Sequence, residues 1–335
     1  MEFQLFYMAR SEYTGDTEKI IKSEISSMAR WIYTCKNFLS IISLVFLLNS
    51  CATNTEEEQK DTLDSGTIYI SADESFKPVI DSQIQVFEAL HPQAKIIPIY
   101  KPEAGCIKDF GIDSIRLVII TRRFNQQEEN FMVDSFRLAP KSLVIAKDAV
   151  AAIVNPSSPD SLFTMSEIRQ ILTGRFKKNL IPIFDGTHAT STVRFIIDSV
   201  LHGDTLTSRT MAAKSSEGVI DYVSKNANAV GFIGVSWIGN HDDTTQMSFL
   251  KKIKMAGLES TDIPDSYVLP WQANIYAGRY PMIRDLVYIL KEKQTGLGKG
   301  FANFLSGEQG QKIFWRAYLV PTQLDFTVRP TILNE

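Results

Sequence analysis

Three consecutive hydroxyl side chains and a nearby arginine form the polar cluster best suited to binding chemistry. Residues 188–203 read HATSTVRFIIDSVLHG, which places Thr190, Ser191 and Thr192 just before Arg194. Apolar residues then recur at three- and four-residue steps, which predicts an amphipathic helix beginning near Thr190. A helix start has unpaired backbone N–H groups and about half a unit of positive charge, so it favours anions. The cluster predicts an anion site; the alternative is ordinary capping by one hydroxyl.

Four more polar clusters stand where a predicted strand gives way to a helix. They are Asp73, Glu74 and Ser75; residues 103–106; Thr121, Arg122 and Arg123; and residues 215–218. Open α/β sheets bind ligands in such loops, so we expect the clusters to converge on one pocket. Arginines there can hold an oxyanion through paired hydrogen bonds, although one of two adjacent arginines can equally be a solvated surface charge. The candidate ligand-binding residues are Glu74, Ser75, Thr121, Arg122, Thr190, Ser191, Thr192 and Arg194.

The elements that must position these side chains alternate between strand and helix. Strands are predicted at residues 66–71, 94–100, 115–121 and 141–156, and in the second half of 215–238. Helices are predicted at residues 74–92, 164–174, from 191 onward, in the first half of 215–238, and as a pair within 299–321. Thr164 and Glu167 match a capping box, and Gly174 marks a helix end. The alternation predicts an α/β fold with largely parallel sheets.

Composition narrows the class of protein. The chain has 335 residues, 44% of them hydrophobic, and a net charge of −3, values compatible with a globular protein of two domains. Since no long basic run occurs, we expect no nucleic-acid partner. The three cysteines, Cys35, Cys51 and Cys106, give neither a disulfide framework nor a zinc-ligand spacing, and no metal or cofactor is expected.

The N-terminal region has the pattern of a secretion signal. Residues 36–51 contain a short apolar core that follows basic residues and ends at Cys51. Residues 48–51, LNSC, resemble a bacterial lipobox, whose cysteine carries lipid, and an acidic tether follows at 51–66. We therefore interpret residues 1–50 as an annotation overrun plus a lipoprotein signal peptide. The expected location is extracytoplasmic, lipid-anchored to a bacterial membrane; an uncleaved membrane anchor is the alternative.

Several segments, in order and spacing, resemble the phosphate-binding proteins of ABC importers. They are AAIVNPSSPDSLFTMSEIRQILTGRFKKN, THATSTVRF, SSEGVIDYVSKNANAVGFIGVSWI and FLSGEQGQKIFWRAYLVP, and the resemblance covers roughly residues 67–325. It implies a two-lobed periplasmic-binding-protein type II fold, each lobe a mixed, mostly parallel sheet flanked by helices, with the ligand cleft between the lobes. Lobe 1 is expected at residues 67–147, lobe 2 at 148–245, and a return to lobe 1 at 246–335.

The same resemblance implies roles for individual residues. Thr190, Ser191 and Thr192 match the Ser-Gly-Thr anion loop of the family, and Ser75 matches a hydroxyl donor in the first strand-to-helix loop. Two departures stand out: no glycine lies within the hydroxyl run, and residues 121–123 replace a loop that often carries a phosphate-accepting aspartate.

A carboxylate in the pocket would select for phosphate. Phosphate keeps at least one proton near neutral pH, whereas sulfate keeps none, so an ionised carboxylate accepts from phosphate and repels sulfate. Asp73 or Glu74 could supply that group. The alternative role of either residue is to complement the positive N-terminal end of the following helix.

The function that the resemblance implies is capture of a tetrahedral oxyanion, above all inorganic phosphate. The expected partners are that oxyanion, an ABC importer permease and the membrane that holds the lipid anchor; the protein is expected to be a monomer and not an enzyme. One alternative is a surface sensor or scaffold with the same fold and a degenerate ligand site. Another is a phosphoester hydrolase using Ser191 or Ser75 with His188 as base, which is disfavoured because no G-x-S-x-G nucleophile motif occurs.

Overall fold

The computed structural model describes residues 61–137, 139–186, 190–292 and 295–324. The predicted signal peptide and Cys51 lie outside the described residues, as does His188. The first strand, β1 (Ser65–Asp73), begins inside the segment predicted as a tether.

One large sheet organises the described part of the chain. Its strands run in the order β2-β1-β3-β12-β4-β8-β6-β7, with β13 and β9 pairing β4 at its side. Their bounds are β2 Gln93–Lys101, β3 Ile115–Ile120, β4 Lys141–Val154, β6 Ile181–Asp185, β7 Met211–Ala213, β8 Ala229–Gly234, β9 Lys254–Met255, β12 Ile283–Leu290 and β13 Val320–Pro321. A smaller sheet has the order β11-β10-β5, with bounds Tyr267–Val268, Gly257–Glu259 and Leu162–Phe163.

The long strand β4 connects two lobes. Its first part pairs antiparallel with β12, and its last part, from Val150 to Val154, pairs antiparallel with β8. On one side β1 pairs parallel with β2 and β3, and on the other β6 pairs parallel with β7 and β8. The expected α/β fold with mixed sheets in two lobes is confirmed. The expected predominance of parallel pairing is wrong, because β12, β13, β8 and β9 pair antiparallel with their neighbours around β4. We call the β1–β3 and β12 side lobe 1 and the β6–β8 side lobe 2.

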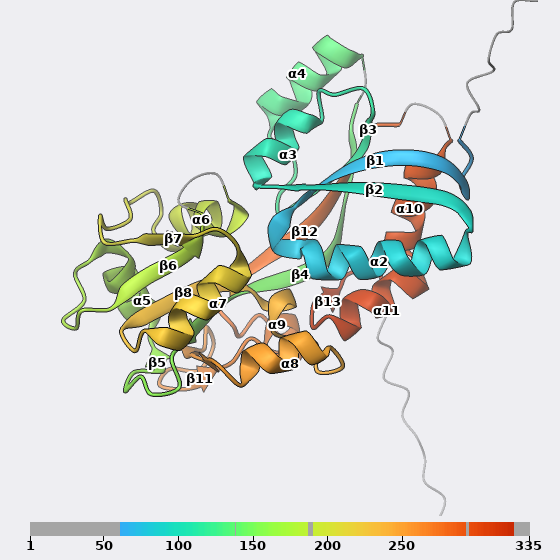
Figure 1. Ribbon diagram of the computed structural model, residues 1–335. Coiled ribbons are helices and arrows are strands. Elements are labelled where there is room, and N and C mark those ends of the chain that lie inside the picture. Colours follow the sequence, from blue (N-terminus) through green and yellow to red (C-terminus); the bar gives the residue numbers. More distant parts are fainter. Residues whose placement is uncertain (1–60, 138, 187–189, 293–294, 325–335) are drawn as a thin grey trace, which may run out of the picture. The chain divides into compact units, whose positions relative to one another are not determined.

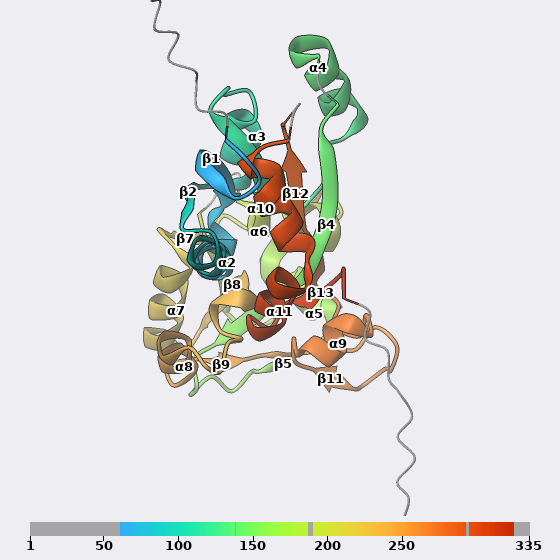
Figure 2. The ribbon, with the colours of Figure 1, turned by 90° about the vertical axis from the view of Figure 1, so that its right-hand side faces the viewer.

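Lobe 1 buries both faces of its sheet. Alternate residues of β3 point to opposite sides: Leu117 and Ile119 pack in one apolar core, and Val118 and Ile120 in another. The first core is covered by α2 (Lys77–Leu90), α10 (Leu297–Ser306) and α11 (Glu308–Arg316), which lie beside one another in Figures 1 and 2. The second core is covered by α3 (Glu103–Asp109) and α4 (Gln126–Phe136). Burial on both faces explains the continuous apolar run of β3.

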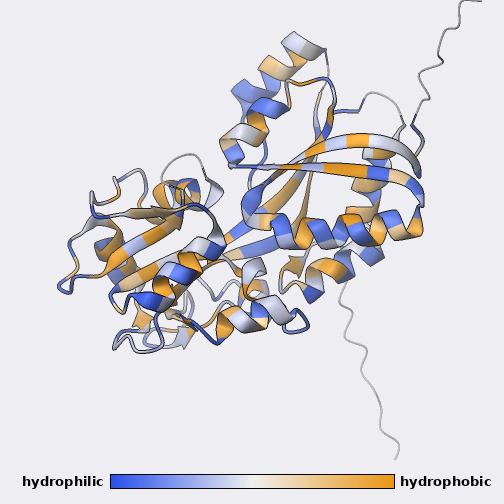
Figure 3. Cartoon of the chain, viewed as in Figure 1, coloured by the Kyte–Doolittle hydropathy of each residue, from blue (hydrophilic) through white to orange (hydrophobic). Residues whose placement is uncertain are grey.

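Lobe 2 likewise has apolar cores between its sheet and the helices that flank it. Its helices are α5 (Met165–Thr173), α6 (Ser191–Phe195), which continues as a π-helical turn, and α7 (Ser216–Lys225). The predicted capping box of Thr164 and Glu167 is confirmed, and Gly174 ends α5 with a φ of +75°. Figure 3 shows hydrophobic residues concentrated in the central strands, with hydrophobic and hydrophilic residues alternating along the helices.

The segment that follows β8 adds two helices and several short strands. It includes α8 (Thr244–Leu250) and α9 (Gln272–Tyr276), and Ala256, Leu258 and Met282 pack in a core of lobe 2. The predicted domain boundary at residue 246 stays a prediction. The polar, turn-rich sequence here predicts a surface excursion, but its short apolar pieces form β9 and β10, which pair with β4 and β5. None of the described helices is long and apolar enough to cross a membrane.

Candidate functional site

Hydroxyl side chains from the two lobes meet where β1 ends and α6 begins. Ser75 lies in η1 (Glu74–Phe76), the short 3-10 helix after β1, and Ser191 is the first residue of α6. Their Oγ atoms are 3.0 Å apart, and both side chains are buried, as is that of Thr192. Thr190 caps α6 by accepting a hydrogen bond from the Val193 N–H at 3.2 Å. The structure thus brings together four of the predicted residues: Ser75 and Ser191 in direct contact, with Thr190 and Thr192 at the same helix start.

A buried arginine that the sequence analysis missed joins this cluster. Arg284 of β12 is 4% exposed, and its Nη1 donates to Ser191 Oγ at 3.0 Å and to Thr192 Oγ1 at 3.3 Å. Its Nη2 lies 3.4 Å from Ser75 Oγ. Its Nε donates to Asp148 Oδ2 at 2.8 Å, which fixes the guanidinium. The available signal was one arginine within the apolar strand sequence MIRDLVYIL.

Three buried aspartates lie around the hydroxyl cluster. Their carboxyl groups outnumber the guanidinium of Arg284. Asp73, Asp148 and Asp185 each have one carboxylate oxygen without a hydrogen-bond partner in the structure described. Burial raises the pKa of Asp73 and of Asp148, although the charge of Arg284 opposes the rise in both. Burial also raises the pKa of Asp185, to about 7, against a hydrogen bond of 2.8 Å from Ser216 Oγ. The site therefore combines hydroxyl donors, one guanidinium and acceptor oxygens.

Glu74 stands beside this region rather than within its hydrogen-bonded centre. It is half-buried, and burial followed by the nearby charge of Asp73 raises its pKa. Asp73 itself is 1% exposed, and its Oδ1 accepts from the backbone N–H of Ser75 at 2.9 Å. Of the two carboxylates considered from sequence, Asp73 is the one built into the hydroxyl cluster.

Thr121 and Arg194 come together in a second polar network that also spans the lobes. Arg194 Nε pairs with Glu103, and its Nη2 donates to Thr121 Oγ1 at 2.7 Å. Thr121 donates to Glu103 Oε1 from its backbone N–H at 2.9 Å and from its hydroxyl at 2.6 Å. Burial disfavours the ionised form of Glu103, but Arg194 and Thr121 outweigh burial and lower its pKa. Arg194 is thus committed to protein partners.

Arg122 is not brought into either network. Its two terminal nitrogens donate to the carboxylate oxygens of Glu128 at 2.6 and 2.7 Å. Glu128 is the N3 residue of α4 and completes a capping box with Asn125. The helix start nearby thus places a carboxylate within reach of Arg122, and the pair lies wholly inside lobe 1.

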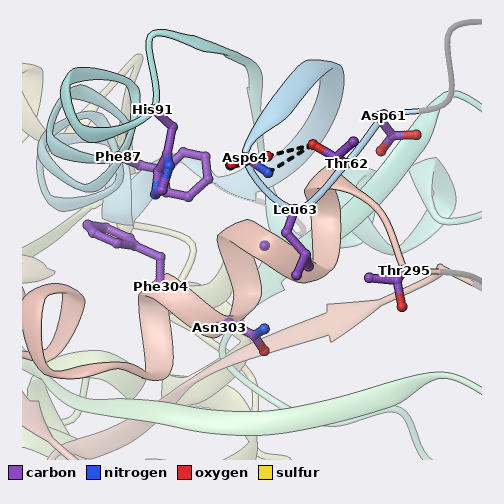
Figure 4. A pocket seen from close by; sticks show the side chains of 10 residues that line it. Asp61, Thr62, Leu63, Asp64, Phe87, His91, Thr295, Asn303 and Phe304 are labelled. Carbon is purple, nitrogen blue, oxygen red and sulfur yellow. Dashed lines mark hydrogen bonds between the residues drawn. The ribbon is translucent and has the colours of Figure 1, made fainter.

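A separate cavity of about 800 Å³ lies in lobe 1 at the C-terminal end of α2 (Figure 4). The rings of Phe87 and Phe304 meet edge to face there, with centres 5.3 Å apart, and the His91 ring lies tilted against Phe87 with its centre 4.6 Å away. The lining residues are Asp61, Thr62, Leu63, Asp64, Phe87, His91, Thr295, Gly300, Asn303 and Phe304. Because they include two carboxylates and neither lysine nor arginine, this cavity suits an oxyanion less well than the Arg284 cluster.

The described residues were also compared with the arrangements that metal ions and reactive thiols need. No group of three or more His, Cys, Asp or Glu side chains is placed there to hold a metal ion. Cys106 is free and buried, and burial raises the pKa of its thiol to about 12, so the reactive thiolate is scarce at neutral pH.

Comparisons with known proteins agree with the two-lobed fold. The model of the PBP superfamily domain matches residues 57–308. The phosphate-binding protein PstS of Bacillus subtilis is 23% identical over 301 residues, which covers 83% of this chain and 90% of that protein. A Clostridium perfringens protein assigned as a phosphate ABC transporter substrate-binding protein, with bound phosphate, has a TM-score of 0.63 at 20% identity, covering 77% of this chain and 100% of its own. An ABC-type phosphate transport receptor from Vibrio cholerae has a TM-score of 0.57 at 15% identity, with coverages of 76% and 100%.

Proposed function

Because the chain belongs to the PBP superfamily, we propose that it is a solute-binding protein that captures inorganic phosphate, without chemical conversion, for an ABC importer. The observation that carries the proposal is the convergence of one buried guanidinium, that of Arg284, on the hydroxyls of Ser75, Ser191 and Thr192. These donors come from separate elements of both lobes. A tetrahedral oxyanion offers several acceptor oxygens, so it can use such donors together.

The names of similar proteins support the same ligand and setting. The B. subtilis relative is a phosphate-binding protein, and the C. perfringens structure contains bound phosphate. By extension, the partner of this chain is an importer permease and its location is extracytoplasmic. Attachment through a lipid on Cys51 is part of the proposal and rests on the sequence of residues 48–51.

Removing the two α6 hydroxyls together, Ser191→Ala with Thr192→Val, is expected to weaken phosphate binding at least about 30-fold. Each hydroxyl that contacts a charged group contributes roughly 1 kcal/mol or more, and a tenfold change corresponds to about 1.4 kcal/mol. Titration calorimetry with phosphate measures the effect. The matched control is Thr173→Val with Ser224→Ala, whose hydroxyls donate to helix carbonyls in lobe 2.

The same calorimetry separates the competing functions. Unchanged affinity in the double variant would place the anion elsewhere. Absence of heat with phosphate, sulfate and molybdate in the wild-type protein would contradict the proposal and favour the sensor or scaffold. Turnover of an added phosphate ester would favour the hydrolase.

Asp73 is the proposed selectivity residue. Its Oδ1 accepts from Ser75, while its Oδ2 has no partner in the described structure and can accept a hydrogen bond from the O–H group of hydrogenphosphate. Asp73→Asn keeps the acceptor for Ser75 and replaces the other oxygen by a donor. We expect this variant to bind sulfate at least about tenfold more tightly than wild type, since a repulsion of 1.4 kcal/mol or more is removed. Competition between sulfate and phosphate measures the change, and unaltered sulfate affinity would exclude Asp73 from this role.

A further inference from the structure

We infer that Glu103 and Arg194 are a positioning pair for the oxyanion site. Their ion pair holds the first turn of α6 against lobe 1 and thereby slows the release of bound anion. The anion-release part of this inference rests on the proposed function; the effect on the spacing of the lobes does not.

Glu103 is an anchor built into lobe 1. It is the first residue of α3, and its side chain is only 2% exposed. One of its oxygens, Oε1, is held by the backbone N–H and the hydroxyl of Thr121, at the end of β3. These two bonds fix the carboxylate in one orientation, and its other oxygen is the one that pairs with Arg194. The anchor therefore exists before lobe 2 approaches it.

Arg194 belongs to the same short helix as the anion-facing hydroxyls. It follows Thr192 by two positions within α6, and its three side-chain nitrogens contact Glu103, Asp198 and Thr121. Because Ser191, Thr192 and Arg194 lie in one capped helical turn, separating Arg194 from Glu103 would also withdraw Ser191 and Thr192 from Ser75. The arginine thus acts on the anion through the helix that it anchors.

The burial of Glu103 makes this contact costly to break. Separation would leave its carboxylate with only the donors of Thr121 and any water that enters. Burial shields the pair from salt, and breaking buried charge pairs across interfaces acts mainly on dissociation rates. The pair is therefore placed to keep the two lobes together while an anion is bound.

The chain contains a matched control pair. Arg122 and Glu128 form a two-point ion pair next to Thr121, with the arginine side chain 27% exposed, close to the 29% of Arg194. Both partners lie in lobe 1, so their contact does not change when the lobes separate. Neutral variants of this pair test for a general loss of charge or stability.

The experiment compares Glu103→Gln, Arg194→Gln and their double variant with Arg122→Gln and Glu128→Gln. Phosphate release is followed by stopped-flow after mixing with a phosphate scavenger. We expect each single variant at Glu103 or Arg194 to release phosphate at least about tenfold faster, and the double variant to release no faster than the faster single, since one interaction is lost in all three. Arg194→Lys, which keeps the charge, should fall between wild type and Arg194→Gln.

Two results would overturn the inference. The first is release at the wild-type rate from both single variants, or acceleration equal to that of the control pair. The second is multiplication of the single effects in the double variant, which would mean that the residues act independently. If wild type binds no phosphate, the proposed function fails, and small-angle scattering of the ligand-free proteins then tests whether the pair holds the lobes together. The radius of gyration must rise in Glu103→Gln and Arg194→Gln but not in Arg122→Gln.

Discussion

Arg284→Lys is expected to reduce phosphate affinity at least about 100-fold while leaving the protein folded. Arginine reaches Ser75, Ser191 and Thr192 with a rigid fork of donors, whereas lysine offers a single flexible ammonium that cannot reproduce this geometry. A hundredfold loss corresponds to about 2.7 kcal/mol, within the range for a charge-assisted, buried contact. Titration calorimetry measures the loss, and circular dichroism melting measures the fold.

Lysine is a better test substitution than alanine at position 284 because it keeps a positive charge near Asp148. That carboxylate is fully buried and pairs with the Arg284 guanidinium at 2.8 Å. Arg284→Ala would leave it without a cation, which typically costs about 3 to 5 kcal/mol and would confuse lost binding with unfolding. Arg116→Lys is the matched control, since Arg116 pairs with Asp61 and Glu292 away from the hydroxyl cluster. If Arg284→Lys binds phosphate with an affinity within twofold of wild type, another residue supplies the positive charge that holds the anion.

Local signals in the sequence were sufficient for elements whose ends are set by neighbouring residues. The capping box at Thr164 and the glycine end of α5 formed as predicted because both depend on residues within one helix. The same holds for Thr190 at the start of α6. The strand predicted at residues 115–121 formed as β3, and its apolar residues are buried on both faces.

The cationic centre of the site depends on long-range pairing and could not be predicted this way. Arg284 reaches the hydroxyls because β12 inserts antiparallel between β3 and β4, bringing residues from the C-terminal part of the chain to the end of β1. The spacing of residues along the sequence does not predict which strands β12 pairs with. Conversely, Arg194 near a helix start and Arg122 after a strand were both predicted to bind the ligand, but their side chains donate to Glu103 and Glu128 instead.

Asp185 is expected to make a large contribution to the way the free energy of unfolding of the ligand-free protein changes with pH. Burial raises its pKa to about 7 in the folded protein, from 3.8. Between these values the folded state holds a proton that the unfolded state has released, so the free energy of unfolding falls as pH rises from about 4 to 7 and then levels off. Since one pKa unit is worth about 1.4 kcal/mol, the ionised carboxylate costs the folded state about 4 kcal/mol above pH 7. The charged groups that act on it are Asp73, Arg284 and Glu74.

Asp185→Asn should therefore stabilise the ligand-free protein at pH 8 by up to about 4 kcal/mol and have little effect at pH 4. Asparagine keeps an oxygen to accept from Ser216 Oγ but cannot ionise. Urea unfolding at pH 4, 6 and 8 measures the difference, and Asp221→Asn, at an exposed carboxylate of α7, serves as the control. Asp73 and Asp148 also have raised pKa values, so wild type and variant share their part of the slope, and only the difference reports on Asp185. Equal slopes in wild type and variant would mean that Asp185 ionises in the folded protein near its ordinary pKa, with a compensating cation or water beside its second oxygen.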